Sequence, residues 1–254
     1  QWFVKPREKR MQLEASGVID PDGSRLKRLR LWAGVGDAGL SVEEGAVSFS
    51  VVPAGAGEAI DIRGKGNWAV HDAGGLLACI PAARQWRGRL GGELSGTCDF
   101  AFQPTRSRLH LVASATGLDV KLGEAFAKSA GDPTRVVLDL QSDSSVPPAP
   151  RSRASLLVEF GAASLEGYAS SSPGDGGGRE IRYGGRLRVS DAAWLLQRTP
   201  ALARMLRGCD VRGSMVATAS AALSGGEIAG EIVCDADDLQ FRIPSVGGVK
   251  QRGS

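Results

Sequence analysis

Two stretches of the chain follow one pattern: residues 68–82 read WAVHDAGGLLACIPA, and residues 187–201 read LRVSDAAWLLQRTPA. In both, a run of alternating apolar residues is followed by Asp-Ala, then by a Leu-Leu pair, then by Pro-Ala. The spacing is constant, because 191 − 72 and 200 − 81 both equal 119. An internal period of this kind indicates one structural unit that is used twice.

The Asp of each stretch is placed to cap a helix. Asp accepts hydrogen bonds from the amides that the first turn of a helix leaves free, so Asp72 and Asp191 are predicted N-caps. Leu76, Leu77 and Ile80 then fit one helical stripe, and the following proline limits the helix. We therefore predict one short helix in each unit.

Outside these helices the apolar residues recur with period two, which is typical of strands. Val47, Phe49 and Val51 share one face of a strand whose other face carries serines, and turn signals such as Asp20-Pro21-Asp22-Gly23 separate the strands. Each unit has room for about five or six strands joined by hairpin-length turns. The sequence predicts a mainly β fold, in which tandem units of about 120 residues form a curled, twisted antiparallel sheet.

The unit boundaries follow from a second recurring feature, a lysine before small or turn-forming residues. Lys5, Lys128 and Lys250 are separated by 123 and 122 residues. We assign residues 1–126 to a first repeat and residues 127–248 to a second. Residues 1–3 are then the tail of a preceding unit and residues 249–254 the start of a third, which is expected of a piece taken from a longer array.

Composition excludes several functional classes. The net charge of +3 is too small to indicate nucleic-acid binding, and no apolar run is long enough to span a membrane. The four cysteines lack the spacing of zinc or thioredoxin-like sites, although Cys209 and Cys234 are free to pair. His71 and His110 have no ligand at metal spacing, and no hydrolase or phosphate-binding motif occurs. We expect no metal, cofactor or enzymatic activity, although a glycosidase-like carboxylate pair is defined in space and is left open.

The start of each unit resembles the Lys-Pro-Ala-Gly-x-Pro segment of AsmA-like proteins of Gram-negative bacteria, which include TamB-like and YhdP-like relatives. The second unit carries it most fully, as Lys128-Ser129-Ala130-Gly131-Asp132-Pro133. The Asp-Ala, Leu-Leu, Pro-Ala helix and the later strand 118–123 (LDVKLG) are similar to the same repeats. In the first unit Arg7 and Glu8 depart from the small residues that the family has there.

The resemblance implies an open β-groove, a half-pipe with an apolar inner face. Such proteins are anchored to the inner membrane, project into the periplasm and are thought to carry phospholipid toward the outer membrane. For this chain it implies a non-enzymatic segment that binds phospholipid or another acyl lipid and meets the envelope membranes through other parts of the protein. The lining that we predict consists of Val47, Phe49, Val51, Leu109, Leu111, Leu156, Val158, Phe160, Leu239 and Phe241.

Three alternatives stay open from the sequence. The same alternation is shown by the core of an ordinary sandwich. The repeats are also compatible with a structural spacer or docking module of the cell envelope that carries no lipid, or with a carbohydrate-active enzyme or lectin. Whatever the function, exposed edges of a truncated sheet favour edge-to-edge self-association of the fragment.

Overall fold

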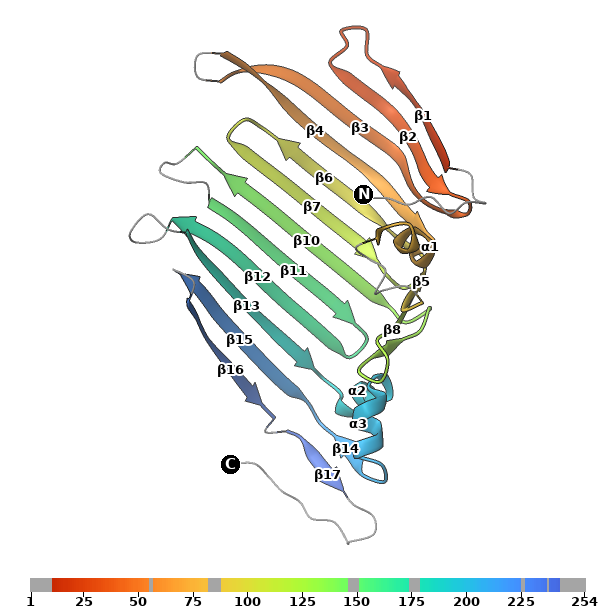
Figure 1. The fold of residues 1–254 in the computed structure, drawn as a ribbon, viewed down its shortest axis with the longest axis vertical. Coiled ribbons are helices and arrows are strands. Elements are labelled where there is room, and N and C mark those ends of the chain that lie inside the picture. The colour runs from red at the N-terminus through yellow and green to blue at the C-terminus, as the bar shows by residue number, and fades with distance from the viewer. Residues whose placement is uncertain are drawn as a thin grey trace.

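The computed structural model describes residues 11–54, 57–81, 88–145, 151–173, 179–224, 227–236 and 238–242. Twelve of its strands form one antiparallel sheet, shown in Figure 1. From edge to edge the order is β1 (Met11–Ile19), β2 (Arg25–Val35), β3 (Ala38–Ala54), β4 (Gly57–His71), β6 (Leu94–Phe102), β7 (Arg106–Ser114), β10 (Thr134–Asp143), β11 (Arg151–Phe160), β12 (Ala163–Pro173), β13 (Arg179–Val189), β15 (Met215–Ser224) and β16 (Glu227–Asp235). The prediction of a mainly β, antiparallel fold is confirmed, and the sheet is open, with β1 and β16 at its edges.

The remaining elements gather at one end of the strands (Figure 1). They are two small sheets and three short helices. The small sheets contain β5 (Leu90–Gly92), β8 (Leu118–Lys121) and β9 (Ala127–Lys128), and β14 (Asp210–Arg212) with β17 (Gln240–Arg242). The helices are α1 (Ala73–Ala78), α2 (Ala192–Arg198) and α3 (Pro200–Met205).

The helices begin where the repeated Asp predicts. The Asp72 carboxylate accepts a hydrogen bond from the Gly75 amide at 3.0 Å, and the Asp191 carboxylate accepts one from the Ala193 amide at 2.9 Å. The second unit differs from the expected single helix, because α2 ends at Arg198 and α3 begins at Pro200. A proline has no amide hydrogen and tolerates only the first turn of a helix, so it ends one helix and opens another.

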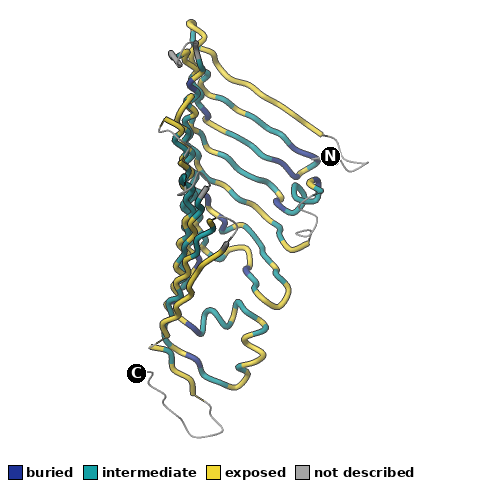
Figure 2. Tube along the Cα trace, turned by 60° about the vertical axis from the view of Figure 1, so that its left-hand side comes forward, coloured by how far each residue is buried: buried dark blue, intermediate teal, exposed yellow. Residues whose placement is uncertain are grey.

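The buried core is a narrow strip beneath the helices. Figure 2 shows the buried apolar residues mostly at the strand ends that carry α1, α2 and the small sheets. The strip comprises Val35, Ala38, Ala73, Cys79, Ala113, Ala115, Phe160, Val189, Ala192 and Val211. The four cysteines are free, so Cys209 and Cys234 do not pair.

The molecule exposes far more surface than a compact protein of its mass. Its accessible surface is 16963 Å², whereas a folded monomer of 26.5 kDa is expected to expose about 10,700 Å². Among the described residues most of the sheet is a single layer, and its exposed faces contribute to this difference.

The sheet runs without interruption through the predicted boundary at residues 126 and 127. Strand β7 of the first unit pairs with β10 of the second, with Leu111 opposite Leu138. The two predicted units therefore share one sheet. The predicted tail at residues 1–3, the third unit at 249–254, and both Lys5 and Lys250 lie outside the described residues.

Candidate functional site

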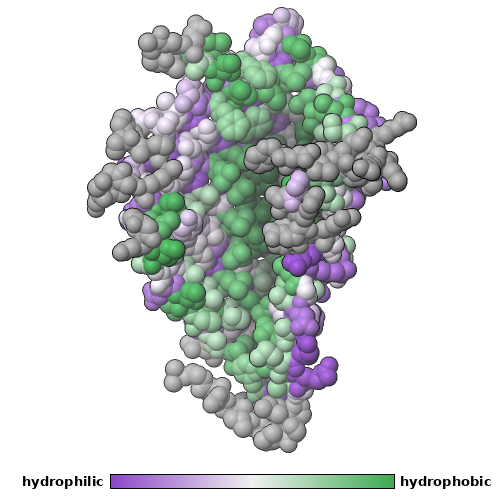
Figure 3. All heavy atoms as spheres, viewed as in Figure 1, coloured by the Kyte–Doolittle hydropathy of each residue, from purple (hydrophilic) through white to green (hydrophobic). Residues whose placement is uncertain are grey.

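Strand register places the apolar residues on one face of the large sheet. Residues directly opposite each other on antiparallel strands point to the same side. One row runs through Leu111, Leu138 and Leu156, and the next through Ala113, Val136 and Val158. Equivalent rows extend the face in both directions, through Val42, Ile62, Phe100 and Phe102 on one side and Leu165, Leu187, Ala219 and Ile232 on the other. Figure 3 shows the result as a hydrophobic band along the molecule.

Eight of the ten predicted lining residues lie on this apolar face. They are Val47, Phe49, Val51, Leu109, Leu111, Leu156, Val158 and Phe160. Several are open to solvent, with Phe49 44% exposed and Val51 65% exposed. Among the described residues, this part of the apolar face has no other element packed against it, and apolar patches of such extent are uncommon on the surfaces of folded proteins.

Phe160 differs from the other seven because the chain itself covers it. The centroid of its ring lies 4.7 Å from that of the Trp194 ring of α2 and 5.6 Å from that of the Phe126 ring, and both pairs have edge-on geometry. The side chain is only 7% exposed. Phe160 therefore belongs to the core beneath the helices and is not part of the open face.

Two predicted lining residues, Leu239 and Phe241, do not belong to the large sheet, and the predicted lining is corrected there. Phe241 pairs with Val211 in the two-stranded sheet of β14 and β17, and Leu239 directly precedes that strand. The large sheet ends at β16, because the chain leaves it after Asp235 and turns toward β14. Alternation identified a strand here without revealing which sheet it joins.

The predicted lining left out much of the open face. Ile60, Phe102, Leu140, Leu165 and Ile232 lie on it and are between 38% and 80% exposed. Their strands show the same alternation as the predicted residues, so the signal was present in the sequence. Only the pairing register shows that all these strands turn their apolar side in one direction.

A row of serines borders the apolar face at the hairpin ends of the central strands. Ser107, Ser142, Ser152 and Ser171 stand directly opposite one another on β7, β10, β11 and β12. The Ser142 and Ser152 hydroxyl oxygens are 3.3 Å apart. Beside this serine border, Phe102, Leu109, Leu140 and their neighbours line an open hollow of about 360 Å³. The apolar face thus ends in hydroxyl groups before the strands end.

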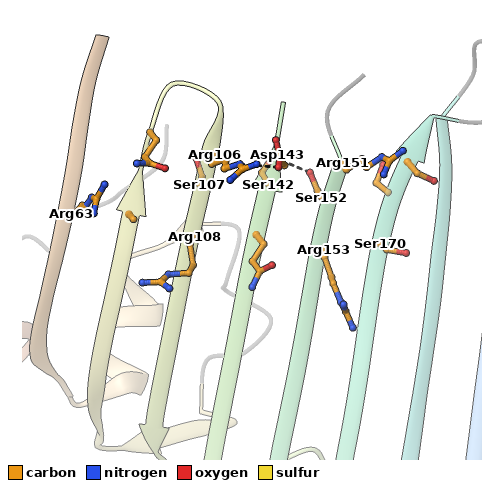
Figure 4. A pocket seen from close by; sticks show the side chains of 15 residues that line it. Arg63, Arg106, Ser107, Arg108, Ser142, Asp143, Arg151, Ser152, Arg153 and Ser170 are labelled. Atoms are coloured by element: carbon orange, nitrogen blue, oxygen red, sulfur yellow. Dashed lines mark hydrogen bonds and ion pairs between the residues drawn. The ribbon is translucent and has the colours of Figure 1, made fainter. Parts of the chain in front are cut away.

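The opposite face of the sheet is polar and carries paired charges. Arg135 pairs with Glu159 at 3.0 Å, Arg108 with Asp99 at 3.0 Å, and His110 contacts Asp139 at 2.7 Å. Near the hairpin ends this face holds a larger hollow of about 820 Å³, shown in Figure 4. Its lining includes the side chains of Arg63, Arg106, Arg108, Arg151 and Arg153.

Asp61 fixes one side of this arginine-lined hollow. It is 4% exposed, and its carboxylate accepts hydrogen bonds from Arg63 at 2.8 Å and from Gln103 at 3.0 Å. These hydrogen bonds, from Arg63 above all, lower the pKa of Asp61 below its ordinary value of 3.8. The carboxylate is therefore ionised at neutral pH and holds Arg63 in place.

The lysine that opens the second unit has a structural role. Lys128 is 4% exposed, and its ammonium donates to the carbonyl oxygens of Leu118 at 2.6 Å, Ser129 at 3.3 Å and Thr116 at 3.4 Å. Burial lowers the pKa of this ammonium below 10.5. The lysine joins the small sheet to the turn before it.

Within the described ranges, no group of three or more His, Cys, Asp or Glu side chains is arranged to hold a metal ion. None of the described helices is long and apolar enough to cross a membrane. Comparisons with family models, curated proteins and solved structures find no match to this chain. A functional assignment therefore depends on the two faces of the sheet and on the motifs of the sequence.

Proposed function

We propose that this chain is a non-enzymatic segment of an AsmA-like protein whose apolar face shields the acyl chains of phospholipid during transport between the inner and outer membranes. The observation that carries the proposal is the apolar face that runs across all twelve strands and that, among the described residues, other elements cover only at its helix-bearing end. In this account the segment lies in the periplasm, and other parts of the protein anchor it to the inner membrane.

The dimensions of the face suit an acyl lipid. Eleven strand spacings of about 4.8 Å give a length of about 53 Å. Between the serine border and the helix-bearing end, Leu140 to Val136 covers about 14 Å of strand β10, close to half of the roughly 30 Å hydrocarbon core of a bilayer. Each methylene that leaves water for such a surface contributes about 0.8 kcal/mol wherever it sits, so a chain is held without any fixed polar partner.

The order of elements supports a repeating array. Strand β4 is followed by α1 and by β5, β6, β7 and β8, and β5 pairs with β8. Strand β13 is followed by α2, α3 and then β14, β15, β16 and β17, and β14 pairs with β17. The repeated Asp and the repeated topology coincide, which favours tandem groove units over an ordinary sandwich.

Lipid retention after purification without detergent tests the proposal. Leu156 is 36% exposed on the apolar face, and the neighbouring Ser155 points to the polar face opposite Asp139 and Tyr168. We expect Leu156→Asp to lower the phospholipid that mass spectrometry finds per protein, and Ser155→Asp, the matched control, to leave it unchanged. Circular dichroism checks that both variants fold.

The same experiment separates the proposal from its alternative, a structural spacer or docking module that carries no lipid. A spacer yields folded wild-type protein without bound lipid. Equal lipid in both variants would place the lipid elsewhere and contradict the apolar face as its site.

A further inference from the structure

The polar face carries another hollow at mid-strand, which we call the Tyr168 hollow after the aromatic side chain that lines it. Its volume is about 650 Å³, within the range of about 300–1,000 Å³ that is usual for ligand sites. It crosses six neighbouring strands, β10, β11, β12, β13, β15 and β16, which Figure 1 shows side by side. Five strand spacings of about 4.8 Å give it a span of about 24 Å, so its shape suits a chain-like ligand.

Strand register builds this hollow from two rows of residues, because directly opposed residues point to the same side of the sheet. One row is Asp139, Ser155, Tyr168, Gly184, Ser220 and Glu231. The next row is Val137, Leu157, Glu166, Arg186, Thr218 and Val233. The hollow therefore combines one aromatic ring with a few aliphatic side chains, hydroxyl groups and charges.

The Tyr168 ring is held against the sheet by a glycine on the next strand. Gly184 stands directly opposite Tyr168, and a side chain at Gly184 would collide with the Tyr168 ring. Glycine at this position lets the ring approach the backbone closely. Tyr168 is nevertheless 50% exposed, so the ring rests on the sheet while much of its surface stays open. An open aromatic surface of this kind binds apolar C–H groups.

Three charged side chains of the hollow have no partner within the chain as described. Glu166, Arg186 and Glu231 are all exposed, and none of them makes an ion pair or a side-chain hydrogen bond to another described residue. Asp139 differs, because it contacts His110 at 2.7 Å. Two free carboxylates can accept hydrogen bonds from a ligand, and the free guanidinium can donate them.

We propose that the Tyr168 hollow binds a neutral oligosaccharide, with one sugar ring stacked on Tyr168 and sugar hydroxyls bonded to Glu166 and Arg186. A sugar ring has a C–H face that packs on an aromatic ring and a rim of hydroxyls that both donate and accept. A cationic ligand fits less well, because Arg186 repels it and a single ring does not form an aromatic cage. The proposal is independent of lipid, since the hollow and the apolar face lie on opposite sides of the sheet.

The test titrates three neutral hexasaccharides, cellohexaose, maltohexaose and chitohexaose, separately into the purified full chain and measures each Kd by calorimetry. We expect wild type to bind at least one of them and Tyr168→Ala to weaken that binding by about tenfold. Tyr168→Phe keeps the ring and should retain most of the affinity, whereas Glu166→Gln should weaken binding by about threefold. The matched control is Tyr183→Ala, since Tyr183 is 46% exposed on the neighbouring strand but lies on the apolar face, opposite Ala169. Circular dichroism checks that every variant folds.

Each outcome supports or overturns the site. Loss of affinity in Tyr168→Ala with unchanged affinity in Tyr183→Ala supports it. Folded wild type that binds none of the three hexasaccharides overturns it, and so do equal losses in the two alanine variants. A further arm titrates spermidine, and binding of spermidine without any hexasaccharide makes the hollow a cation site and overturns the proposal. None of these results bears on lipid transport, which is tested separately by lipid retention on the apolar face.

Discussion

Replacing Phe160 by alanine tests which part of the apolar face the chain itself covers. The Phe160 ring is nearly buried between Trp194 and Phe126, so Phe160→Ala removes a packed ring and leaves a cavity. Such a change in a core costs about 3–5 kcal/mol, of which each edge-on ring contact accounts for about 0.5–1.5 kcal/mol. We expect a loss near the lower end, about 3 kcal/mol, because a single-layer sheet lets solvent reach the site.

Phe49→Ala is the matched control, since it makes the same substitution on the same face where no helix covers the ring. Phe49 is already 44% exposed, so we expect a loss of only about 1 kcal/mol. For a chain of this size about 1 kcal/mol corresponds to roughly 2–4 °C in Tm. Thermal unfolding followed by circular dichroism should therefore place Phe160→Ala about 6–12 °C below wild type and Phe49→Ala about 2–4 °C below.

The two variants should rank in the opposite order for lipid. Phe49→Ala removes part of the open surface and should lower retained lipid at nearly unchanged stability. Equal losses of Tm in both variants, or a larger loss in Phe49→Ala, would refute the division into a covered strip and an open face.

Three further predictions concern single groups. Lys128→Met should lower the free energy of unfolding by about 2 kcal/mol in urea, because three carbonyl oxygens lose their donor. Since the folded pKa of Lys128 lies below 10.5, wild type should also gain stability relative to this variant as pH rises toward 10.5. A difference that stays constant with pH would contradict the buried ammonium. The pKa of Asp61 is lowered in the folded protein, so its contribution to the free energy of unfolding is complete above pH 3.8 and is lost as pH falls through the folded pKa. Asp61→Asn should remove this acid-dependent part of the stability profile. An unchanged profile would argue against the hydrogen bonds from Arg63 and Gln103. Asp191→Ala should lower the free energy of unfolding by about 1 kcal/mol through loss of the α2 cap, whereas no change would mean that the cap is not needed.

Local sequence signals predicted the elements well. Alternation in β3 and β11 and the Asp72 and Asp191 caps are short-range patterns, and each depends on residues that are near in sequence. These patterns also predicted a mainly antiparallel sheet, whereas its openness was implied only by the family resemblance. The break between α2 and α3 was missed, although Pro200 carried the signal.

Long-range pairing was the part that the sequence did not reveal. Phe241 alternates like Phe49, yet it joins a different sheet, because its partner Val211 is fixed by the path of the chain after β16. Phe160 alternates like Leu156, yet a helix covers it. The arginine-lined hollow was also not predicted from the sequence, since Arg63, Arg108 and Arg153 come together only through strand register. Which residues meet across strands depends on register, and composition does not determine it.

Photo-crosslinking at two adjacent leucines tests the central claim most directly. Leu156 lies on the apolar face opposite Leu138, and Leu157 lies on the polar face opposite Val137. A photoreactive amino acid is introduced at each position in turn, the protein is irradiated after purification without detergent, and the intact mass is measured. The account predicts an added phospholipid mass at position 156 and none at position 157. No adduct at 156 in folded protein, or equal adducts at both positions, would contradict it.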